Sequence, residues 1–353
     1  MAAPSPERLR GDLVRLLHRG GDIREFSLGA ARILARAVPF DGVCVLTLDP
    51  ATHLPTAEVV ENGLPRAETV RMVEIEIGGA DVNSFTALGH SGTVAASLSG
   101  TTHGRLDRSR RHRELRRPHG FGDELRAVLA GDSATWGGLT LLRTADRSPF
   151  SADDVALVAS LARHLAEGLR RATLHAALGA EPVNDDASAG LLLLAPDNSV
   201  ARADAAAERW LDSLGADGQV PGVVAAVARR ARGIADGEPW ETVARARVRT
   251  ASGRWLLLRG SSLGHETAVI LEPVRSHELA PLIADAYELT ERERAVTQLV
   301  AQGLATAAIG ERLHISPWTV QDHLKSIFEK VGVGSRGELV ARVFFEHDAP
   351  RLR

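Results

Sequence analysis

The side chains best suited to chemistry lie in one short segment near the C-terminal end of the sequence. Trp318, Thr319, Gln321, Asp322 and Lys325 recur at helical spacing and would share the outer face of a helix. Such a face offers hydrogen-bond donors, acceptors and an indole ring, which are groups that recognise base edges in the major groove of DNA. These residue types favour recognition of a partner over the making and breaking of covalent bonds.

Several other chemistries lack the residues that they need. The only lysines are Lys325 and Lys330, and neither follows a glycine, which argues against a phosphate-binding loop of the Walker type and against kinase chemistry. Cys44 is the only cysteine, which excludes an intramolecular disulfide and a zinc site built on paired cysteines. We therefore expect no metal site and no enzyme activity, and the sequence identifies no cofactor.

Composition places the chain among soluble multidomain proteins. It has 353 residues, a net charge of −3 and 44% hydrophobic residues, so any basic surface that binds DNA must be local. Residues 1–20 lack a sustained apolar core, and no apolar run is long enough to cross a bilayer. We expect a cytoplasmic protein without a membrane partner.

Local signals predict four helices over residues 289–343. Thr290 with Glu293 forms a capping box, and Ser335 with Glu338 forms a second one at the start of the fourth helix. Ser316 and Pro317 are typical N-cap and first residues of a helix. The turn 314–316 is short enough to make the second and third helices cross sharply, as in a helix-turn-helix.

The helical periodicity also predicts which side of each helix is buried. The third helix packs inward through Val320, Leu324, Ile327, Phe328 and Val331, which leaves Ser326 on the outer face with the residues named above. Within the second helix, Gly310 has a low helix propensity, and a close helix–helix approach at this point would compensate for it.

The whole segment resembles the LuxR-type helix-turn-helix family, through LTERERAV, GLATAAIGERL and ISPWTVQDHLKSIFEKVGVGSRGEL. The resemblance implies that the third helix reads double-stranded DNA and that the fourth supports a homodimer on inverted repeats. By position, the implied DNA-binding residues are Ser316, Trp318, Thr319, Gln321, Asp322, Lys325, Lys330 and Arg336, and the implied dimerisation residues are Leu339, Val343 and Phe344. This chain departs from many relatives in having neutral Gln321, followed by acidic Asp322, where a basic side chain is common.

The N-terminal half has the pattern of an antiparallel sheet flanked by helices. Two helices over 5–38 precede strands at 42–48 and 57–61, residues 69–77 and 82–88 are helical or irregular, and strands at 123–129 and 135–142 precede a long helix capped by Ser151. This order resembles a GAF sensor domain over residues 5–174. Possible lining residues of an effector pocket in it are Cys44, Phe85, Phe121 and Trp136, although core packing explains the aromatic residues equally well.

The stretch 101–120 is unusually rich in basic residues. It could gate an anionic effector or contact DNA outside the main site, but a solvated loop and helix explain such a charge run as well. Its basic side chains are His103, Arg105, Arg108, Arg110, Arg111, His112, Arg113, Arg116, Arg117 and His119.

The rest of the chain connects these two regions. A linker is expected over 175–189, a PAS-like domain over 190–275, a helical connector over 276–287 and the LuxR-type domain over 288–347. In the PAS-like domain, strands at 191–194, 200–203, 242–248, 255–259 and 268–271 are predicted, with helices at 205–211 and 223–231. The expected fold class is multidomain α+β, with a four-helix all-α domain at the C-terminus.

This layout favours a sequence-specific transcriptional regulator. Its sensor domains would respond to a small molecule or a protein and would tune dimeric binding to an inverted-repeat operator. Gln321 and Asp322 leave open a different class, a regulator that titrates protein partners without touching DNA.

Overall fold

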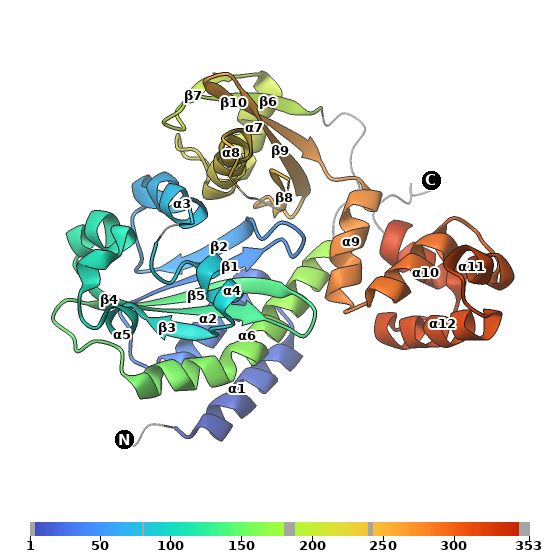
Figure 1. Cartoon of the computed structure of the whole chain (residues 1–353), viewed down its shortest axis with the longest axis horizontal. Coiled ribbons are helices and arrows are strands. Elements are labelled where there is room, and N and C mark those ends of the chain that lie inside the picture. The colour runs from blue at the N-terminus through green and yellow to red at the C-terminus, as the bar shows by residue number, and fades with distance from the viewer. Residues whose placement is uncertain (1–3, 80, 180–187, 239–242, 346–353) are drawn as a thin grey trace.

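The computed structural model describes residues 4–79, 81–179, 188–238 and 243–345, which form two sheet domains followed by a group of helices (Figure 1). The first sheet has five antiparallel strands in the order β2-β1-β5-β4-β3. Its strands are β1 (Gly42–Leu48), β2 (Pro55–Glu61), β3 (Ala95–Ser97), β4 (Phe121–Ala130) and β5 (Thr135–Thr144). The four predicted strands are confirmed, whereas β3 is too short to show the alternation by which a strand is predicted.

Helices cover both faces of this first sheet. Successive residues of a strand point to opposite faces. A side chain at Gly137 of β5 would meet Leu169 of α6 (Ala152–Leu178), and one at Gly138 would meet the ring of Phe85 of α4 (Phe85–Ser91). We call the side facing α4 the α4 face. Helices α1 (Pro6–Arg19) and α2 (Ile23–Leu34) contact α6 on the other side.

The core of the N-terminal domain lies between the sheet and these three helices. It joins residues of α1, α2 and α6 to Leu125, Leu139 and Leu141 of the strands. Ser151 caps α6 as predicted and forms a capping box with Asp154, and α6 continues beyond the domain boundary expected at residue 174. On the α4 side, the chain between β2 and β4 includes α3 (Thr69–Ile77) and α5 (Leu98–Thr102).

The middle domain repeats the strand order of the first domain. Its five antiparallel strands lie in the order β7-β6-β10-β9-β8, so the first to fifth strands of this sheet take the same positions as β1 to β5 in the first sheet. Its elements are β6 (Gly190–Leu194), β7 (Val200–Ala203), α7 (Ala205–Ser213), α8 (Gly222–Ala235), β8 (Arg245–Arg249), β9 (Trp255–Leu263) and β10 (Glu266–Pro273). All seven predicted elements are present. Residue 242 of the third predicted strand and residues 180–187 of the linker lie outside the described residues.

The middle domain packs on the first domain, so the two are not joined by the linker alone. Helix α8 contacts α3, and β8 contacts β2 (Figure 1). A bidentate pair joins Arg247 of β8 to Asp49 after β1, with nitrogen–oxygen distances of 2.8 and 3.0 Å. Both side chains are buried, at 3% and 1% exposure.

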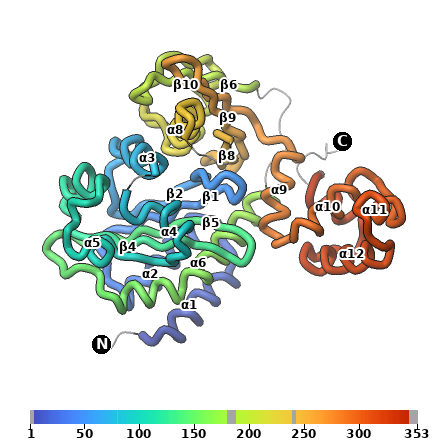
Figure 2. Tube along the Cα trace, in the orientation of Figure 1, coloured from blue at the N-terminus to red at the C-terminus, as the bar shows by residue number. Residues whose placement is uncertain are grey.

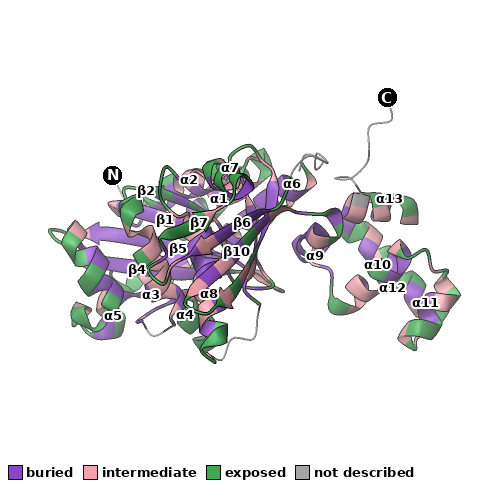
Figure 3. Cartoon of the chain, turned by 90° about the horizontal axis from the view of Figure 1, so that it is seen from above, coloured by how far each residue is buried: buried purple, intermediate pink, exposed green. Residues whose placement is uncertain are grey.

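The remaining helices are the predicted connector and C-terminal module. The connector is α9 (Ser276–Ala286), and the module consists of α10 (Glu291–Ala301), α11 (Thr306–Leu313), α12 (Pro317–Val331), α13 (Arg336–Val340) and the final turn η5 (Ala341–Phe345). Helix α9 contacts both α6 and η5, so it stands between the sheet domains and the module (Figure 2). Buried residues follow the strands and the inward sides of the helices (Figure 3). Within the described part of the chain, no helix combines the length and hydropathy needed to cross a membrane.

Candidate nucleic-acid interface

A tight turn sets the angle between α11 and α12. His314 ends α11 in the left-handed conformation, at φ 54°, and the amide of Ile315 donates to the carbonyl of Gly310 at 2.9 Å. A Cβ on Gly310 would lie 2.7 Å from the carbonyl oxygen of Ile315. The expected close approach at Gly310 is therefore present, but the neighbour is the turn backbone and not a second helix.

The start of α12 is fixed by the residues predicted to cap it. The Ser316 hydroxyl accepts from the Thr319 amide at 3.0 Å and contacts the Thr319 hydroxyl at 2.8 Å. Pro317 follows at the first helical position, and Gly332 ends the helix in the left-handed conformation. The caps therefore hold both ends of the helix that would read DNA.

Helix α12 has a buried side and an exposed side, as predicted. Its buried residues Val320, Leu324, Ile327 and Val331 belong to the core. On the opposite side, Gln321, Asp322 and Lys325 are exposed and Trp318 is 73% exposed. Thr319 is half-buried. The exposed side thus carries an indole, an amide, a carboxylate and an ammonium group.

Glu293 is buried on α10 and pulls two α12 side chains inward. Its carboxylate accepts from Lys330 Nζ and from the Ser326 hydroxyl, both at 2.7 Å. Burial raises the pKa of Glu293, but the bonds from Lys330, Ser326 and the Thr290 amide outweigh it and lower the pKa to about 2. Ser326 is therefore not on the outer face, which corrects the prediction. Lys330 is engaged within the module and does not project freely toward a phosphate.

Arg336 also makes its contacts inside the module. Its guanidinium donates to the Leu304 carbonyl at 2.9 Å and to the Thr306 hydroxyl at 2.6 Å. These bonds tie the start of α13 to the start of α11. The second capping box forms only in part, because the Ser335 hydroxyl accepts from the Glu338 amide while the Glu338 carboxylate accepts from Gly334.

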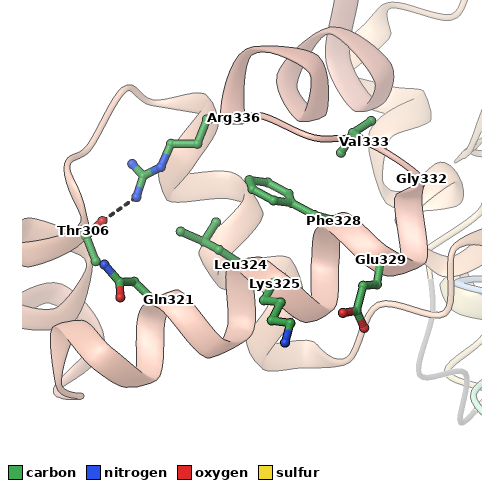
Figure 4. Close-up of a pocket in the computed structure, with 9 residues that line it drawn as sticks. All are labelled: Thr306, Gln321, Leu324, Lys325, Phe328, Glu329, Gly332, Val333 and Arg336. Atoms are coloured by element: carbon green, nitrogen blue, oxygen red, sulfur yellow. Dashed lines mark hydrogen bonds between the residues drawn. The ribbon is translucent and has the colours of Figure 1, made fainter.

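An open groove of about 660 Å³ runs beside the exposed face of α12 (Figure 4). In Figure 4, Leu324 and Phe328 project from α12 on the side of Arg336, Val333 lies on the segment after Gly332, and Gln321, Lys325 and Glu329 lie along α12. The lining residues are Thr306, Gln321, Leu324, Lys325, Phe328, Glu329, Gly332, Val333 and Arg336. The periodicity used for prediction assigned Leu324 and Phe328 to the core, so it could not identify their part in a groove.

The residues predicted for dimerisation are covered within the single chain. Leu339 is 0% and Val343 is 1% exposed, and both share a core with residues of α9. Phe344 is partly buried against the same core. Helix α9 contacts η5, which includes Val343 and Phe344, so a dimer that uses these two residues would need α9 to move away from η5. The dimerisation role of Leu339, Val343 and Phe344 stays a prediction.

The four residues suggested for an effector pocket do not share one environment. Trp136 is 1% exposed and belongs to the core on the α6 side, so it is not in a common pocket with Phe85 on the α4 face. Phe121 is buried at 7% exposure. Cys44 is half-buried, and burial raises the pKa of its thiol to about 12. At that pKa the thiol is neutral near neutral pH and is a poor nucleophile.

The basic stretch 101–120 contributes a buried ion network. Arg111 is 0% exposed and bonds to Glu124 through Nε at 2.9 Å and also through Nη2, and to Asp81 through Nη1 at 3.0 Å. Arg116 donates to Glu124 at 3.2 Å. The other arginines of the stretch are exposed. The solvated-loop interpretation therefore fails for Arg111 and Arg116, which fold inward.

Known proteins resemble the C-terminal module most clearly. Residues 287–343 match the family "Bacterial regulatory proteins, luxR family" and form its helix-turn-helix. A "Putative HTH-type transcriptional regulator Mb0914c" of Mycobacterium bovis is 48% identical over 52 residues, which are 15% of this chain and 6% of that protein. The "Transcriptional regulatory protein UhpA" of Escherichia coli K12 is 45% identical over 56 residues, 16% of this chain and 29% of that protein. The chain thus spans less than a third of the length of these two relatives.

Distant solved structures resemble the N-terminal region. One is the GAF domain/HD domain protein from Geobacter sulfurreducens, with a TM-score of 0.32 and 18% identity over 44% of this chain and 96% of that one. Among the described residues, no group of three or more His, Cys, Asp or Glu side chains is placed to hold a metal ion.

Proposed function

We propose that the chain is a cytoplasmic transcriptional regulator without catalytic activity, which binds specific duplex DNA through α12. The observation that carries the proposal is the exposed face of Trp318, Gln321, Asp322 and Lys325 on a helix of the LuxR-family module. In the major groove, glutamine pairs with adenine, aspartate accepts from cytosine N4, and lysine donates to guanine.

The sensor domains would control when this face meets its operator. The active form would be a homodimer on an inverted repeat, and its formation would require η5 to become accessible. Helix α9 supports this route, because it contacts α6 on one side and η5 on the other. A small molecule or protein that binds one arrangement of α9 more tightly would shift the population toward it.

Selection of random duplex DNA by the full chain tests the proposal, repeated at two salt concentrations. The expected result is an enriched inverted repeat with half-sites about one helical turn apart. Gln321→Ala or Lys325→Ala should change or abolish the enriched sequence. Arg209→Ala, at an exposed arginine of α7, serves as the matched control. Binding without enrichment, but with a steep salt dependence, would mean phosphate contacts alone and would contradict base reading by α12.

A second candidate is a regulator that titrates protein partners without binding DNA. The observation that favours it is the acidic pair Asp322 and Glu329, both exposed on α12 beside Lys325. Complete absence of DNA binding by the full chain, together with capture of a protein whose binding is lost in Trp318→Ala, would establish this alternative. Assay of the purified chain for nucleotide turnover tests the absence of catalysis.

A further inference from the structure

Three strands place Cys44, Thr140 and Arg126 in one row on the α4 face. Cys44 pairs with Thr140, and Thr140 pairs with Arg126. Thr140 is two residues from Gly138, so both point to the face covered by Phe85. The Arg126 guanidinium lies 3.8 Å from the centre of the Phe85 ring. The row is therefore polar, crosses the middle of the sheet and has an aromatic wall at one end.

Arg126 leaves part of its guanidinium without a partner. Its Nη1 donates to Glu76 at 2.8 Å and to the Asn83 carbonyl at 3.0 Å. The side chain is only 4% exposed. Its Nε is buried and has no hydrogen-bond partner among the described residues. An unpaired N–H of a buried cation is costly, and a bound oxyanion would satisfy it.

Arg116 is the second incompletely paired cation. Its side chain is 7% exposed, and within the described part of the chain its hydrogen bond is the one from Nε to Glu124 at 3.2 Å. Burial lowers the pKa of Arg116, the neighbouring charge of Glu124 partly offsets this, and the charges of Arg111 and Arg126 lower the pKa further. Arg111, by contrast, uses Nε, Nη1 and Nη2 in bonds to carboxylates or a carbonyl.

The charges of both incompletely paired arginines influence the pKa of the Cys44 thiol and lower it. The charges of Glu58 and Glu76 raise it. Glu58 is exposed on the edge strand β2 and pairs with Leu46. Cys44 itself is half-buried, so solvent reaches this end of the row. Glu124 pairs with both Arg111 and Arg116, and Glu76 pairs with both Arg111 and Arg126, so each incompletely paired arginine shares its carboxylate with Arg111.

We propose that Arg116 and Arg126 bind the oxyanion group of a small anionic effector, a carboxylate or a phosphate, above Cys44 and Thr140. The guanidinium fork matches either group in a bidentate arrangement, and Phe85 bounds the site on one side. As an effector site the inference rests on the proposed function, but binding itself does not depend on DNA recognition.

Cys44 is the only cysteine and gives a direct readout of the site in the full chain. The measurement is the rate of its alkylation by a large excess of iodoacetamide at alkaline pH, where more of this thiol with its raised pKa is ionised, followed by mass spectrometry. The probes are succinate and inorganic phosphate, each compared with sodium chloride at matched ionic strength. A probe at ten times its dissociation constant should slow alkylation by about tenfold, because only the free protein reacts. Protection by succinate but not by phosphate identifies a carboxylate site, and the reverse identifies a phosphate site.

Variants separate binding from folding. Arg116→Gln and Arg126→Gln should remove the protection, whereas Arg105→Gln, at an exposed arginine of the same stretch, should retain it. If a glutamine variant unfolds, Arg116→Lys decides the question, because it keeps the charge beside Glu124 and loses the fork. Absence of saturable protection by both probes in the wild-type chain, or protection that survives in folded Arg116→Lys and Arg126→Gln, would overturn the proposal. A chain that shows protection but selects no DNA would refute the proposed function alone.

Discussion

The N-terminal domain and the C-terminal module hold their charged side chains in opposite ways. In the first, Arg111, Arg116 and Glu124 are almost fully buried and pair between elements. In the module, the charges of α12 face solvent, and helix starts rest on caps such as Ser316 that bond three residues away. The N-terminal domain pairs these charges in its interior, whereas α12 leaves its charges exposed to solvent. The effect of a charge removal should therefore differ sharply between the two.

The largest effect is expected from Arg111→Met. The change leaves Glu124 and Asp81 buried without their main partner, and breaking a buried pair in this way costs about 3–5 kcal/mol. Equilibrium urea unfolding of the full chain measures the loss. Arg110→Met is the matched control, because its pair with Glu114 is 49% and 32% exposed and contributes about 1 kcal/mol or less. Equal losses in the two variants would mean that burial does not make the Arg111 network more important to stability than an exposed pair.

Among the described residues from α10 to η5, the buried charged side chain is Glu293, and its contribution to stability should depend on pH. The pKa of Glu293 is lowered from 4.5 to about 2, a difference equivalent to about 3 kcal/mol of stability. A lowered folded-state pKa stabilises the fold above pH 4.5, and this stabilisation is lost as the pH falls from 4.5 toward 2. Thermal unfolding of wild type and Glu293→Gln should differ most near neutral pH and converge near pH 2. A constant difference across that range would mean that the charge of Glu293 does not stabilise the module.

The contrast between local caps and long-range ion pairs also explains which features could be predicted from the sequence. Caps act over three residues, so Thr290, Ser151 and Ser316 predict where their helices begin. The ion network joins Arg111 to Asp81 and Glu124, residues 30 and 13 positions away, and no local pattern pairs them. The exposed face of α12 was predictable from its period.

The partners of α12 side chains were not predictable from that period. Lys330 and Ser326 both turn to Glu293, which lies on a different helix and is separated from them by 37 and 33 residues. The contact of α9 with η5, where Val343 lies, likewise joins segments that are distant in the sequence. The sequence therefore predicts which side of α12 is exposed, but it does not predict which α12 side chains bond to a residue of another helix.

On the exposed face, a charge removal should change recognition and leave stability almost unchanged. Lys325→Ala should weaken binding to the selected operator by about 1–3 kcal/mol if it contacts a base. Its unfolding curve should match that of wild type, because Lys325 is exposed and makes no hydrogen bond or ion pair with the described residues that the substitution would break. Fluorescence anisotropy with labelled operator measures the affinity. Unchanged affinity combined with lowered stability would place Lys325 with the interior charges instead.

The smallest expected effect is at Ser316. Replacing it with Ala removes the acceptor for the Thr319 amide and should cost about 1 kcal/mol. Ser316→Asp should restore this stability, because any short side chain with an acceptor oxygen can cap a helix. Arg111→Lys should not restore the N-terminal domain in the same way, since an ammonium group cannot reproduce the fork that bonds Glu124 and Asp81. Urea unfolding of Ser316→Ala, Ser316→Asp and Arg111→Lys tests both halves of this expectation. If Arg111→Lys were as stable as wild type, the buried network would depend on charge alone, and its geometry would matter no more than that of a surface cap.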